Sequence, residues 1–308
     1  MKFLNRENYL NTVKEISFMK KGQGIQFNWI FVIIAGVIIL AFFATFAVRF
    51  KDLQDRKDNA EIARGIDNLF YGLSATTQYN SIDSHWTFNF KYNCDHFIIN
   101  DDYIQDLDNK IIFSAKEVNT DNILIWTKEF KKPFFAANLL YVIDLDKEYY
   151  LIGENSLDDF PKSLKINRNS PDKDDKGVFV YFRQPDPVGL NDLKERGSVI
   201  WVDGNNIKFL NSGKEAVYYD ESTLLAAIFS EDYEEYECGF DRLMNKYDNL
   251  RKIYYQKSNY LSTLSNCDYS LAKEILKRNV NQDNLLDFSS SLNQENERLW
   301  QNGCEVIF

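Results

Sequence analysis

The sequence has few of the side chains and motifs with which enzymes usually act. Its 308 residues include only two histidines, His85 and His96, which lie in strand-like segments without the spacing of a metal-ligand pair. No serine stands in a Gly-x-Ser-x-Gly context, and no lysine stands in a phosphate-binding loop. We therefore expect a protein that is not an enzyme and that holds no cofactor or metal.

The chain also lacks an excess of positive charge. It has 36 basic and 46 acidic residues, which give a formal net charge of −10 at pH 7. Proteins that bind nucleic acids need cationic surface to neutralise phosphates. The composition therefore argues against a nucleic-acid partner and is typical of a solvated, soluble surface.

The acidic segments do not make a convincing site. Asp172–Gly177 is superficially similar to a calcium-binding loop, but Lys176 and Arg183 occupy the fifth and twelfth positions, where ligand oxygens are required. The pairs Asp101–Asp102 and Asp158–Asp159 are interpreted as surface or helix-start carboxylates. All three segments are expected to be solvated.

The most informative feature is a long apolar run. Residues 29–48 carry no charge, and Thr45 has their only hydroxyl group. A helix of this length spans roughly 30 Å at about 1.5 Å per residue, which matches the hydrocarbon core of a bilayer. Trp29 and Phe50 lie where interfacial aromatic residues belong. No second run approaches this length, so the sequence predicts a single-pass membrane protein. The expected partner of its apolar helix is the lipid bilayer.

A cleaved secretory signal is the main alternative to a retained anchor. Its apolar core would span about 7–15 residues and would be followed by small residues. Here the run is longer and Arg49-Phe50-Lys51 follows it, which favours retention. The flanking charge leaves the orientation open, because five basic residues precede the run and five more lie in residues 49–64.

Four cysteines are present, none of them in a close pair: Cys94, Cys238, Cys267 and Cys304. A zinc knuckle or ribbon is therefore not expected. The even number fits two disulfides in an oxidising compartment, and four reduced thiols in a cytoplasmic domain are the alternative. A helix over residues 231–261 would place Cys238 about 40 Å from Cys267. A returning helix would bring Cys304 back to Cys238, so Cys238–Cys304 is the first candidate disulfide.

The expected fold is a mixed α+β ectodomain that follows one transmembrane helix. The predicted parts are a polar leader (1–22), the transmembrane helix (29–48), a juxtamembrane helix (49–76), a strand-rich α/β region (84–230) and a helical region packed on it (231–303). In the juxtamembrane helix, apolar residues with helical spacing are expected to pack on the domain: Ile62, Ile66, Leu69, Phe70 and Leu73.

Several segments are predicted as strands, namely residues 86–92, 95–100, 110–113, 123–126, 139–144 and 149–152. Two hairpins are expected, one joining 141–144 to 149–152 and one joining 199–202 to 207–210. Residues 149–153, a helix over 155–165 and residues 177–182 resemble a βαβ unit with a parallel crossover. Gly153 stands alone where a nucleotide-binding fold would have a glycine-rich loop.

The C-terminal third is predicted to form a helical hairpin. Its first helix has an apolar seam with spacings of four and three residues: Tyr236, Phe240, Leu243, Tyr247, Leu250 and Tyr254. A later helix continues similar spacing through Leu285, Phe288, Leu292 and Leu299. Because the seam is shorter than three heptads, packing within the chain is favoured over a dimeric coiled coil.

The N-terminal segment resembles a known family of signals. Lys20-Lys21-Gly22-Gln23, followed by a neutral spacer and a long apolar helix, resembles the class III signal of archaeal type IV pilin-like proteins. The resemblance implies cleavage between Gly22 and Gln23 and a helix that anchors and polymerises subunits. Phe27 departs from the family, in which many members carry glutamate at that position.

A second resemblance covers most of the chain. The helix start Gln26–Phe31 and the segment Leu225–Cys238 are similar to those of uncharacterised single-pass membrane proteins of small archaea. This likeness implies no known activity.

The sequence thus predicts a single-pass envelope protein in the cell membrane with an acidic extracytoplasmic domain. It is expected to act through protein–protein contacts or self-association, as a pilin-like or receptor-like protein does. One alternative is a membrane-tethered enzyme or ligand-binding protein whose site is not recognisable. Another is a membrane scaffold with a cytoplasmic domain.

Overall fold

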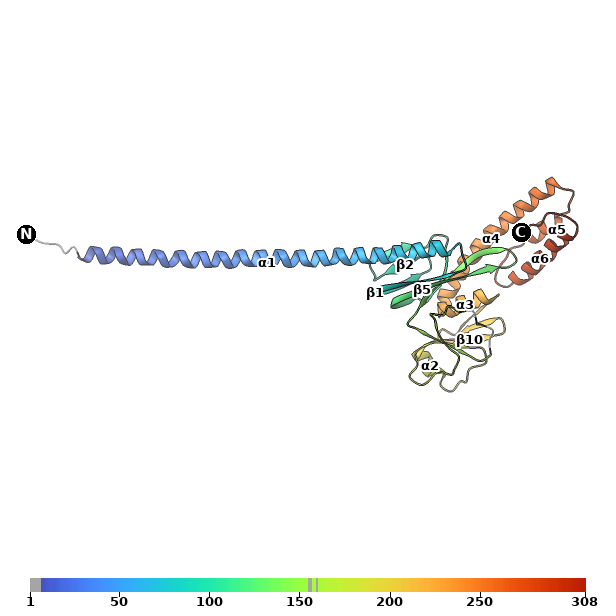
Figure 1. Ribbon diagram of the computed structural model, residues 1–308, viewed down its shortest axis with the longest axis horizontal. Helices are drawn as coiled ribbons and strands as arrows, with labels where there is room; N and C mark the ends of the chain where they lie inside the picture. The colour runs from blue at the N-terminus through green and yellow to red at the C-terminus, as the bar shows by residue number, and fades with distance from the viewer. Residues whose placement is uncertain (1–6, 155–156, 159) are drawn as a thin grey trace, which may run out of the picture. The chain divides into compact units, whose positions relative to one another are not determined.

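The computed structural model describes residues 7–154, 157–158 and 160–308, and it describes the side chains of these residues other than 7–28 and 84–86. The chain divides into two compact units, Met1–Asp58 and Asn59–Phe308, and each is described by itself. The secondary structure is mixed α+β, with one long N-terminal apolar helix and further helices at the C-terminus (Figure 1).

The first unit contains most of helix α1 (Glu7–Leu73). Its large apolar side chains between Trp29 and Leu53 are each 49–73% exposed. Among the described residues, this is the one helix long and apolar enough to cross a membrane, and none of its most apolar stretch is buried within the structure. The expected apolar helix is therefore present.

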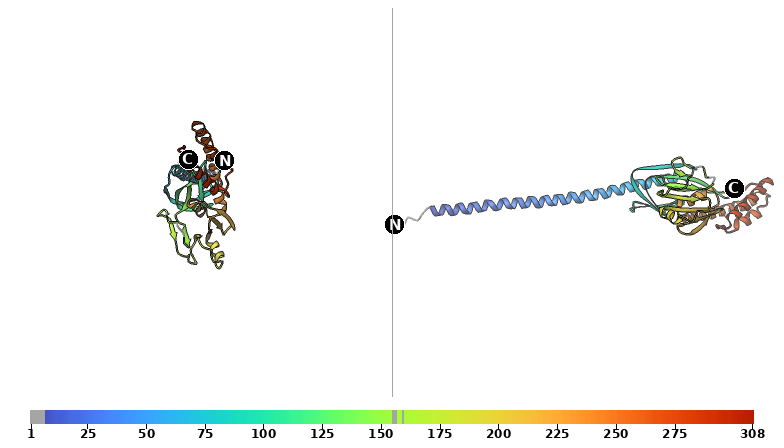
Figure 2. Two further views of the ribbon diagram at one scale, coloured as in Figure 1. Left: turned by 90° about the vertical axis from the view of Figure 1, so that its right-hand side faces the viewer. Right: turned by 90° about the horizontal axis from the view of Figure 1, so that it is seen from below.

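Among the described residues of the second unit, the strands form two sheets of six strands each. Figures 1 and 2 show this unit in three views. The first sheet has the order β3 (Tyr103–Asp106), β2 (His96–Ile99), β1 (Tyr79–Asn93), β5 (Glu117–Lys131), β6 (Phe135–Asp144), β4 (Ile111–Ser114). The second sheet has the order β12 (Lys214–Val217), β11 (Asn206–Phe209), β10 (Gly197–Asp203), β9 (Gly177–Tyr181), β7 (Glu148–Ile152), β8 (Lys165–Asn167). The further helices are α2 (Leu190–Arg196), α3 (Glu221–Ser230), α4 (Tyr233–Leu264), α5 (Ser270–Lys277) and α6 (Leu285–Gln301).

Alternating side chains divide the interior into separate cores. Along β6, Leu139 and Tyr141 face the central core, which both sheets share with α3, α4, α5 and α6. Leu140 and Val142 face a second core on the other side of the first sheet, where the end of α1 packs. Because successive strand residues point to opposite faces, a strand buried on both faces is apolar throughout.

The C-terminal end of α1 covers one face of the first sheet. Ala63, Ile66, Phe70 and Leu73 recur at spacings of three and four residues and are buried there. The rings of Phe70 and Phe97 meet edge to face with centroids 5.8 Å apart. The apolar stripe expected in residues 62–73 is therefore packed on the domain, and the helix ends at Leu73, close to the expected limit.

Helix α3 lies at the centre of the domain and was not expected. Every residue from Ser222 to Ser230 is buried. Asp220 and Thr223 form a capping box at its N-terminus, and the Tyr141 hydroxyl donates to the carbonyl oxygen of Ser222 at 2.8 Å. A helix buried on all sides has no polar face, so its sequence shows no helical periodicity.

Three expectations about the strands have different outcomes. The hairpin over residues 199–210 is confirmed, since β10 and β11 pair antiparallel with Ile200 opposite Phe209. The hairpin over residues 141–152 is wrong, because β6 belongs to the first sheet and β7 to the second. The parallel pairing of β7 with β9 is confirmed.

The helix expected over residues 155–165 is wrong for the residues described there. Leu157, Phe160 and Leu164 still face the central core, so their helix-like spacing reflects burial of a loop. Pro161 in their midst lacks the N–H group that a helix would use.

The C-terminal region has three helices where a hairpin of two was expected. The apolar seam of α4 packs within the chain, as predicted, because Tyr236, Phe240, Leu243 and Tyr247 are buried in the central core. α5 packs against α4, and α6 packs against α5 (Figure 1). The ring of Phe288 in α6 also meets that of Tyr247 in α4, with centroids 6.1 Å apart. The extra helix changes which cysteines meet.

Candidate functional site

All four cysteines form disulfides in the second unit. Cys94 pairs with Cys238 and Cys267 pairs with Cys304, with Cα–Cα distances of 5.8 and 5.9 Å. The expected Cys238–Cys304 pairing is therefore wrong. The two bonds close loops of 144 and 37 residues, and the loss of unfolded-chain entropy stabilises the fold by about 5 and about 4 kcal/mol.

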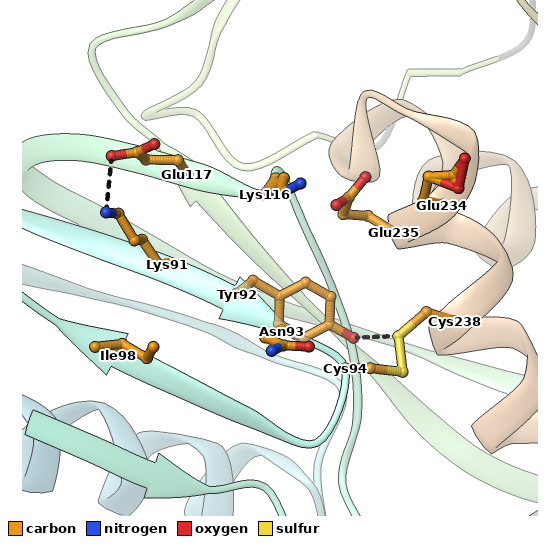
Figure 3. A pocket seen from close by; sticks show the side chains of 10 residues that line it. All are labelled: Lys91, Tyr92, Asn93, Cys94, Ile98, Lys116, Glu117, Glu234, Glu235 and Cys238. Carbon is orange, nitrogen blue, oxygen red and sulfur yellow. Dashed lines mark hydrogen bonds and ion pairs between the residues drawn. A yellow bond between two sulfur atoms is a disulfide. The ribbon is translucent and has the colours of Figure 1, made fainter. Parts of the chain in front are cut away.

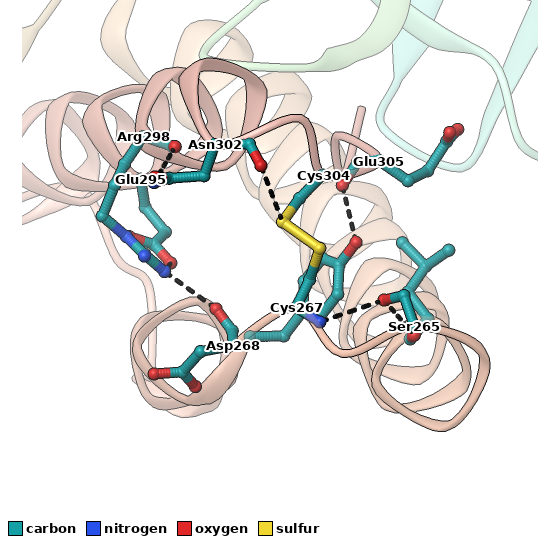
Figure 4. Close-up of a disulfide and its surroundings, with 10 residues drawn as sticks. Ser265, Cys267, Asp268, Glu295, Arg298, Asn302, Cys304 and Glu305 are labelled. Atoms are coloured by element: carbon teal, nitrogen blue, oxygen red, sulfur yellow. Dashed lines mark hydrogen bonds and ion pairs between the residues drawn. A yellow bond between two sulfur atoms is a disulfide. The ribbon is translucent and has the colours of Figure 1, made fainter.

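The number of helical passes explains the pairing. α5 leads the chain back along α4, so that Gln282 Nε2 donates to Glu237 Oε1 at 3.0 Å near the start of α4. α6 then returns to the other end, where the Tyr269 hydroxyl donates to the carbonyl oxygen of Glu305 at 2.9 Å. Cys304 consequently meets Cys267 (Figure 4).

Hydrogen bonds and an ion pair made by Arg298 surround the second disulfide. Arg298 Nη2 donates to the carbonyl oxygen of Asp268 at 2.8 Å, and its Nε donates to Glu295 at 2.7 Å (Figure 4). The Glu295 carboxylate is almost fully buried and is neutralised by this pair. The arrangement therefore fixes the chain end on α4 and α5.

A close approach of α4 to the first sheet brings the other two cysteines together. A Cβ atom on Gly239 would lie 2.6 Å from Phe113 Cε1 and 2.8 Å from the Ile112 oxygen, so only glycine fits there. One turn further along, Arg242 Nη1 donates to the carbonyl oxygen of Cys94 at 2.7 Å. Cys94 in the β1–β2 turn is thereby held against Cys238.

A hollow of about 530 Å³ lies beside this disulfide (Figure 3). Its walls come from β1, β2 and the turn between them, from the β4–β5 connection with the start of β5, and from the first turns of α4. It is lined by Lys91, Tyr92, Asn93, Cys94, Ile98, Lys116, Glu117, Glu234, Glu235 and Cys238.

Several charged residues that line the hollow have partners of opposite charge in it or beside it. Lys91 Nζ lies 2.6 Å from Asp101 and 3.8 Å from Glu117, and the hydrogen bond to Asp101 raises its pKa. Burial raises the pKa of Glu235, toward which Lys116 points (Figure 3). The hollow therefore combines apolar surface with polar groups of nearly balanced charge.

Tyr92 is the buried phenol of the hollow. Its hydroxyl donates to the carbonyl oxygen of Ile112 at 2.8 Å and lies 3.8 Å from Cys238 Sγ. Burial raises its pKa well above the usual value, so the phenol stays protonated at neutral pH. It acts as a hydrogen-bond donor that holds the end of β1 against the backbone of Ile112.

The residues singled out from the sequence do not converge. His96 is half-buried in β2 opposite Asn93, while the side chain of His85 lies outside the described side chains. Gly22 and Gln23, the candidate cleavage site, lie within the bounds of α1, and their side chains are likewise outside the description.

The acidic segments have structural partners. Arg196 Nη1 donates to the carbonyl oxygens of Asp172 and Asp175 at 2.6 and 2.8 Å, which holds that loop in place. Asp158 forms an ion pair with Arg168 at 2.7 Å. Within the described part of the chain, no cluster of three or more His, Cys, Asp or Glu residues could hold a metal ion.

No protein-family model, curated protein or solved structure matches this chain. The function has to be inferred from the residues themselves.

Proposed function

We propose that α1 anchors the chain in a membrane and that residues 59–308 form an extracytoplasmic domain that works through contacts with a protein partner or with further copies of the chain. The observation that carries this proposal is the pairing of all four cysteines in a unit that follows a long exposed apolar segment. Disulfides form and persist in oxidising compartments and are rare in the cytosol.

The apolar stretch of α1 supports the anchoring part. Sixteen large apolar side chains between Trp29 and Leu53 are about half exposed or more, and no other described part of the chain covers them. Leaving that surface in water costs roughly 25 cal/mol per Å². A bilayer removes this cost and also suits the continuous helix, whose backbone groups bond to each other.

The domain supports a role in binding more than one in catalysis. In the hollow beside Cys94–Cys238, Lys91 is paired with Asp101, and the Tyr92 hydroxyl is engaged with a backbone carbonyl. Catalytic sites usually hold a nucleophile or base that is free and activated. The hollow mixes apolar and charged lining, and a non-obligate protein interface is likewise about as apolar as the rest of a protein surface.

Labelling of an introduced cysteine tests the membrane side. Lys173→Cys lies on an exposed loop, so a membrane-impermeant maleimide should label the new thiol in intact cells. The four native cysteines should react after denaturation only when a reductant has been added. Labelling of the introduced thiol solely after lysis, together with four native thiols reactive without reductant, would place the domain in the cytoplasm.

The pilin-like branch has its own test. Cleavage of the Gly22–Gln23 bond would make Gln23 the first residue of a mature subunit that begins just before the apolar helix. Mass spectrometry of the N-terminal peptide should then show a chain starting at Gln23. An intact peptide that joins Gly22 to Gln23 would remove the pilin branch and leave the anchor in place.

A further inference from the structure

A second concave region lies away from the Cys94–Cys238 hollow. Two hollows of about 540 and 630 Å³ share the lining residues Asp108, Asn109, Ile111 and Lys246 and so form one groove, called here the Lys246 groove. One end is lined by α4, including Asn245 and Asn249. The other is lined by Tyr71, Ser74 and Asn138. The residues come from separate segments that meet only in the fold.

Lys246 stands at the junction of the two hollows and lacks a counter-ion. Its side chain is half-buried and makes no ion pair or hydrogen bond with any described residue. Burial lowers its pKa, and no neighbouring charge offsets that effect. An ammonium group that is partly removed from water without a partner is energetically unfavourable, and an anion beside it relieves the cost.

The other cations near the groove are already engaged. Lys110 Nζ lies 2.9 Å from Asp67 Oδ1, and Arg242 is bound to the backbone of Cys94 and to Asp95 at 3.2 Å. An anion that enters the groove therefore meets one available positive charge, at Lys246. A single charge in a groove of this size selects a ligand with one acidic group over a polyanion.

The remaining polar lining consists mostly of neutral groups. The side-chain amides of Asn109, Asn245 and Asn249 bond to no described residue, and each can both donate and accept. Asn138 Nδ2 donates to the Ser74 oxygen at 3.0 Å, whereas its buried Oδ1 accepts from no described residue. These amides can form hydrogen bonds with the hydroxyl groups of a ligand, because a hydroxyl group also both donates and accepts hydrogen bonds.

Asp108 narrows the choice of ligand. Asp108 also lines both hollows, and the negative charge of its carboxylate disfavours a bare inorganic anion there, whereas a carboxylate accepts hydrogen bonds from hydroxyl groups. A ligand that places an acidic group near Lys246 and hydroxyl groups near Asp108 and the amides satisfies both. Tyr71, which is 78% exposed, adds a surface on which a sugar ring can pack.

We propose that the Lys246 groove binds an acidic sugar, whose carboxylate or phosphate pairs with Lys246 and whose hydroxyl groups bond to Asp108 and the flanking asparagines. The shared chemistry is one anionic group on a polyhydroxylated ring. This site goes beyond the proposed contact function and does not depend on which side of a membrane the domain occupies.

Calorimetric titration of the full chain in detergent tests the site with four probes: glucuronic acid, glucose 6-phosphate, glucose and inorganic phosphate. At least one of the two acidic sugars should bind at least tenfold more tightly than glucose and inorganic phosphate. Binding confined to glucuronic acid would identify a uronic-acid residue of a polysaccharide, and binding confined to glucose 6-phosphate would identify a sugar phosphate.

Variants of the groove connect binding to Lys246. Lys246→Met should weaken binding of the acidic sugar at least tenfold and Lys246→Arg much less, while Asn249→Ala should weaken it several-fold. Lys252→Met is the matched control, because it removes a positive charge from the same helix outside the groove and should bind like the native chain. The Lys246→Met chain should keep its native thermal midpoint, which shows that it is folded.

Four results would overturn the proposal. Three of them are binding of glucose as tight as that of both acidic sugars, native affinity in Lys246→Met, and no binding of either acidic sugar at millimolar concentration. Loss of binding in Lys252→Met equal to that in Lys246→Met would also overturn it, since the effect would then be one of net charge.

Discussion

The two ends of α1 share one helical backbone but differ in the arrangement of their apolar side chains. Between Trp29 and Leu53 apolar residues lie on every side of the helix and are exposed. Between Asn59 and Leu73 they form one stripe, which is buried against the first sheet. A helix that is apolar all round suits a surrounding apolar solvent, whereas a stripe suits a protein surface on one side.

Polar residues at the two ends differ in the same way. The Thr45 hydroxyl donates to the carbonyl oxygen of Ala41 at 2.8 Å, so its hydrogen bond stays within its own helix. Asn59 is buried and accepts from Asn100 Nδ2 at 2.7 Å, so its hydrogen bond joins the helix to a loop of the domain. In the apolar end, the Thr45 side chain bonds to the backbone of its own helix. In the other end, the Asn59 side chain bonds to a different segment of the domain.

The largest expected effect comes from placing charge in the apolar end. The double variant Ile38→Arg/Leu40→Arg should make membrane insertion less favourable by about 5–7 kcal/mol, because each central arginine costs about 2.5–3.5 kcal/mol. Alkaline extraction of membranes should release this chain, while Ile38→Leu/Leu40→Ile stays in the pellet. Full retention of the arginine variant would contradict the proposed anchor.

The next largest effect is a loss of domain stability when the buried apolar stripe at the end of α1 is altered. Phe70→Ala should lower the free energy of unfolding of the domain by about 3–5 kcal/mol, because it leaves a cavity beside Phe97. Denaturant unfolding followed by near-ultraviolet circular dichroism measures this change. Asn68→Ala, an exposed neighbour, should alter stability by less than about 0.5 kcal/mol. Equal stability of the two variants would show that the stripe is not packed against the sheet. Neither Phe70→Ala nor Asn68→Ala should change the extraction of the chain from membranes.

A smaller effect on domain stability is expected at Asn59 and none at Thr45. Asn59→Ala should cost about 1–2 kcal/mol of domain stability, because it removes the acceptor for Asn100 Nδ2. Thr45→Val should leave the same unfolding transition unchanged, since its hydroxyl bonds only to Ala41. A loss of domain stability in Thr45→Val would argue that the apolar end contributes to the fold of the domain.

The smallest effect is stabilising. Gly65→Ala should raise the stability of the domain by about 0.5–1 kcal/mol, because glycine is a poor helix former and the nearest atom to the new Cβ is Ile82 Cδ1 at 3.9 Å. Gly36→Ala should not move the melting temperature of the domain, as nothing lies within 4 Å of its Cβ position. A destabilised Gly65→Ala chain would mean that α1 and β1 pack more closely than described.

The arrangement of α1 was predictable because its two ends have opposite and clear patterns. Elsewhere, patterns were ambiguous. β6 and β7 are buried on both faces, so no alternation shows which sheet each belongs to. The short connection between Asp144 and Glu148 allowed a hairpin equally well as a passage from one sheet to the other.

Spacing alone misled the interpretation of residues 155–165. Leu157, Phe160 and Leu164 have helix-like intervals, but an extended loop can present apolar residues to a core at the same intervals. Pro161 was the contrary signal. For the cysteines, the error lay in expecting one returning helix, since the segment between Leu264 and Leu285 contains the short α5.

The Lys246 groove could hardly have been found from the sequence. Its residues come mainly from α1, the β3–β4 loop, the start of β4, β6 and α4, and only the fold brings them together. One local signal exists around Lys246. The positions three and four residues before and after it hold Leu243, Arg242, Asn249 and Leu250, so no carboxylate on its own helix can pair with it.

The disulfide between Cys94 and Cys238 also determines how the domain transmits tension. A pull applied between α1 and α4 would pass from β1 directly through the sulfur atoms to the helix. The 143 residues between them, which include the whole second sheet and α3, would be spared from stretching by the disulfide. At full extension that segment would add roughly 500 Å to the length of the chain. Reduction of this one bond would therefore turn a stiff linkage into a long and compliant tether.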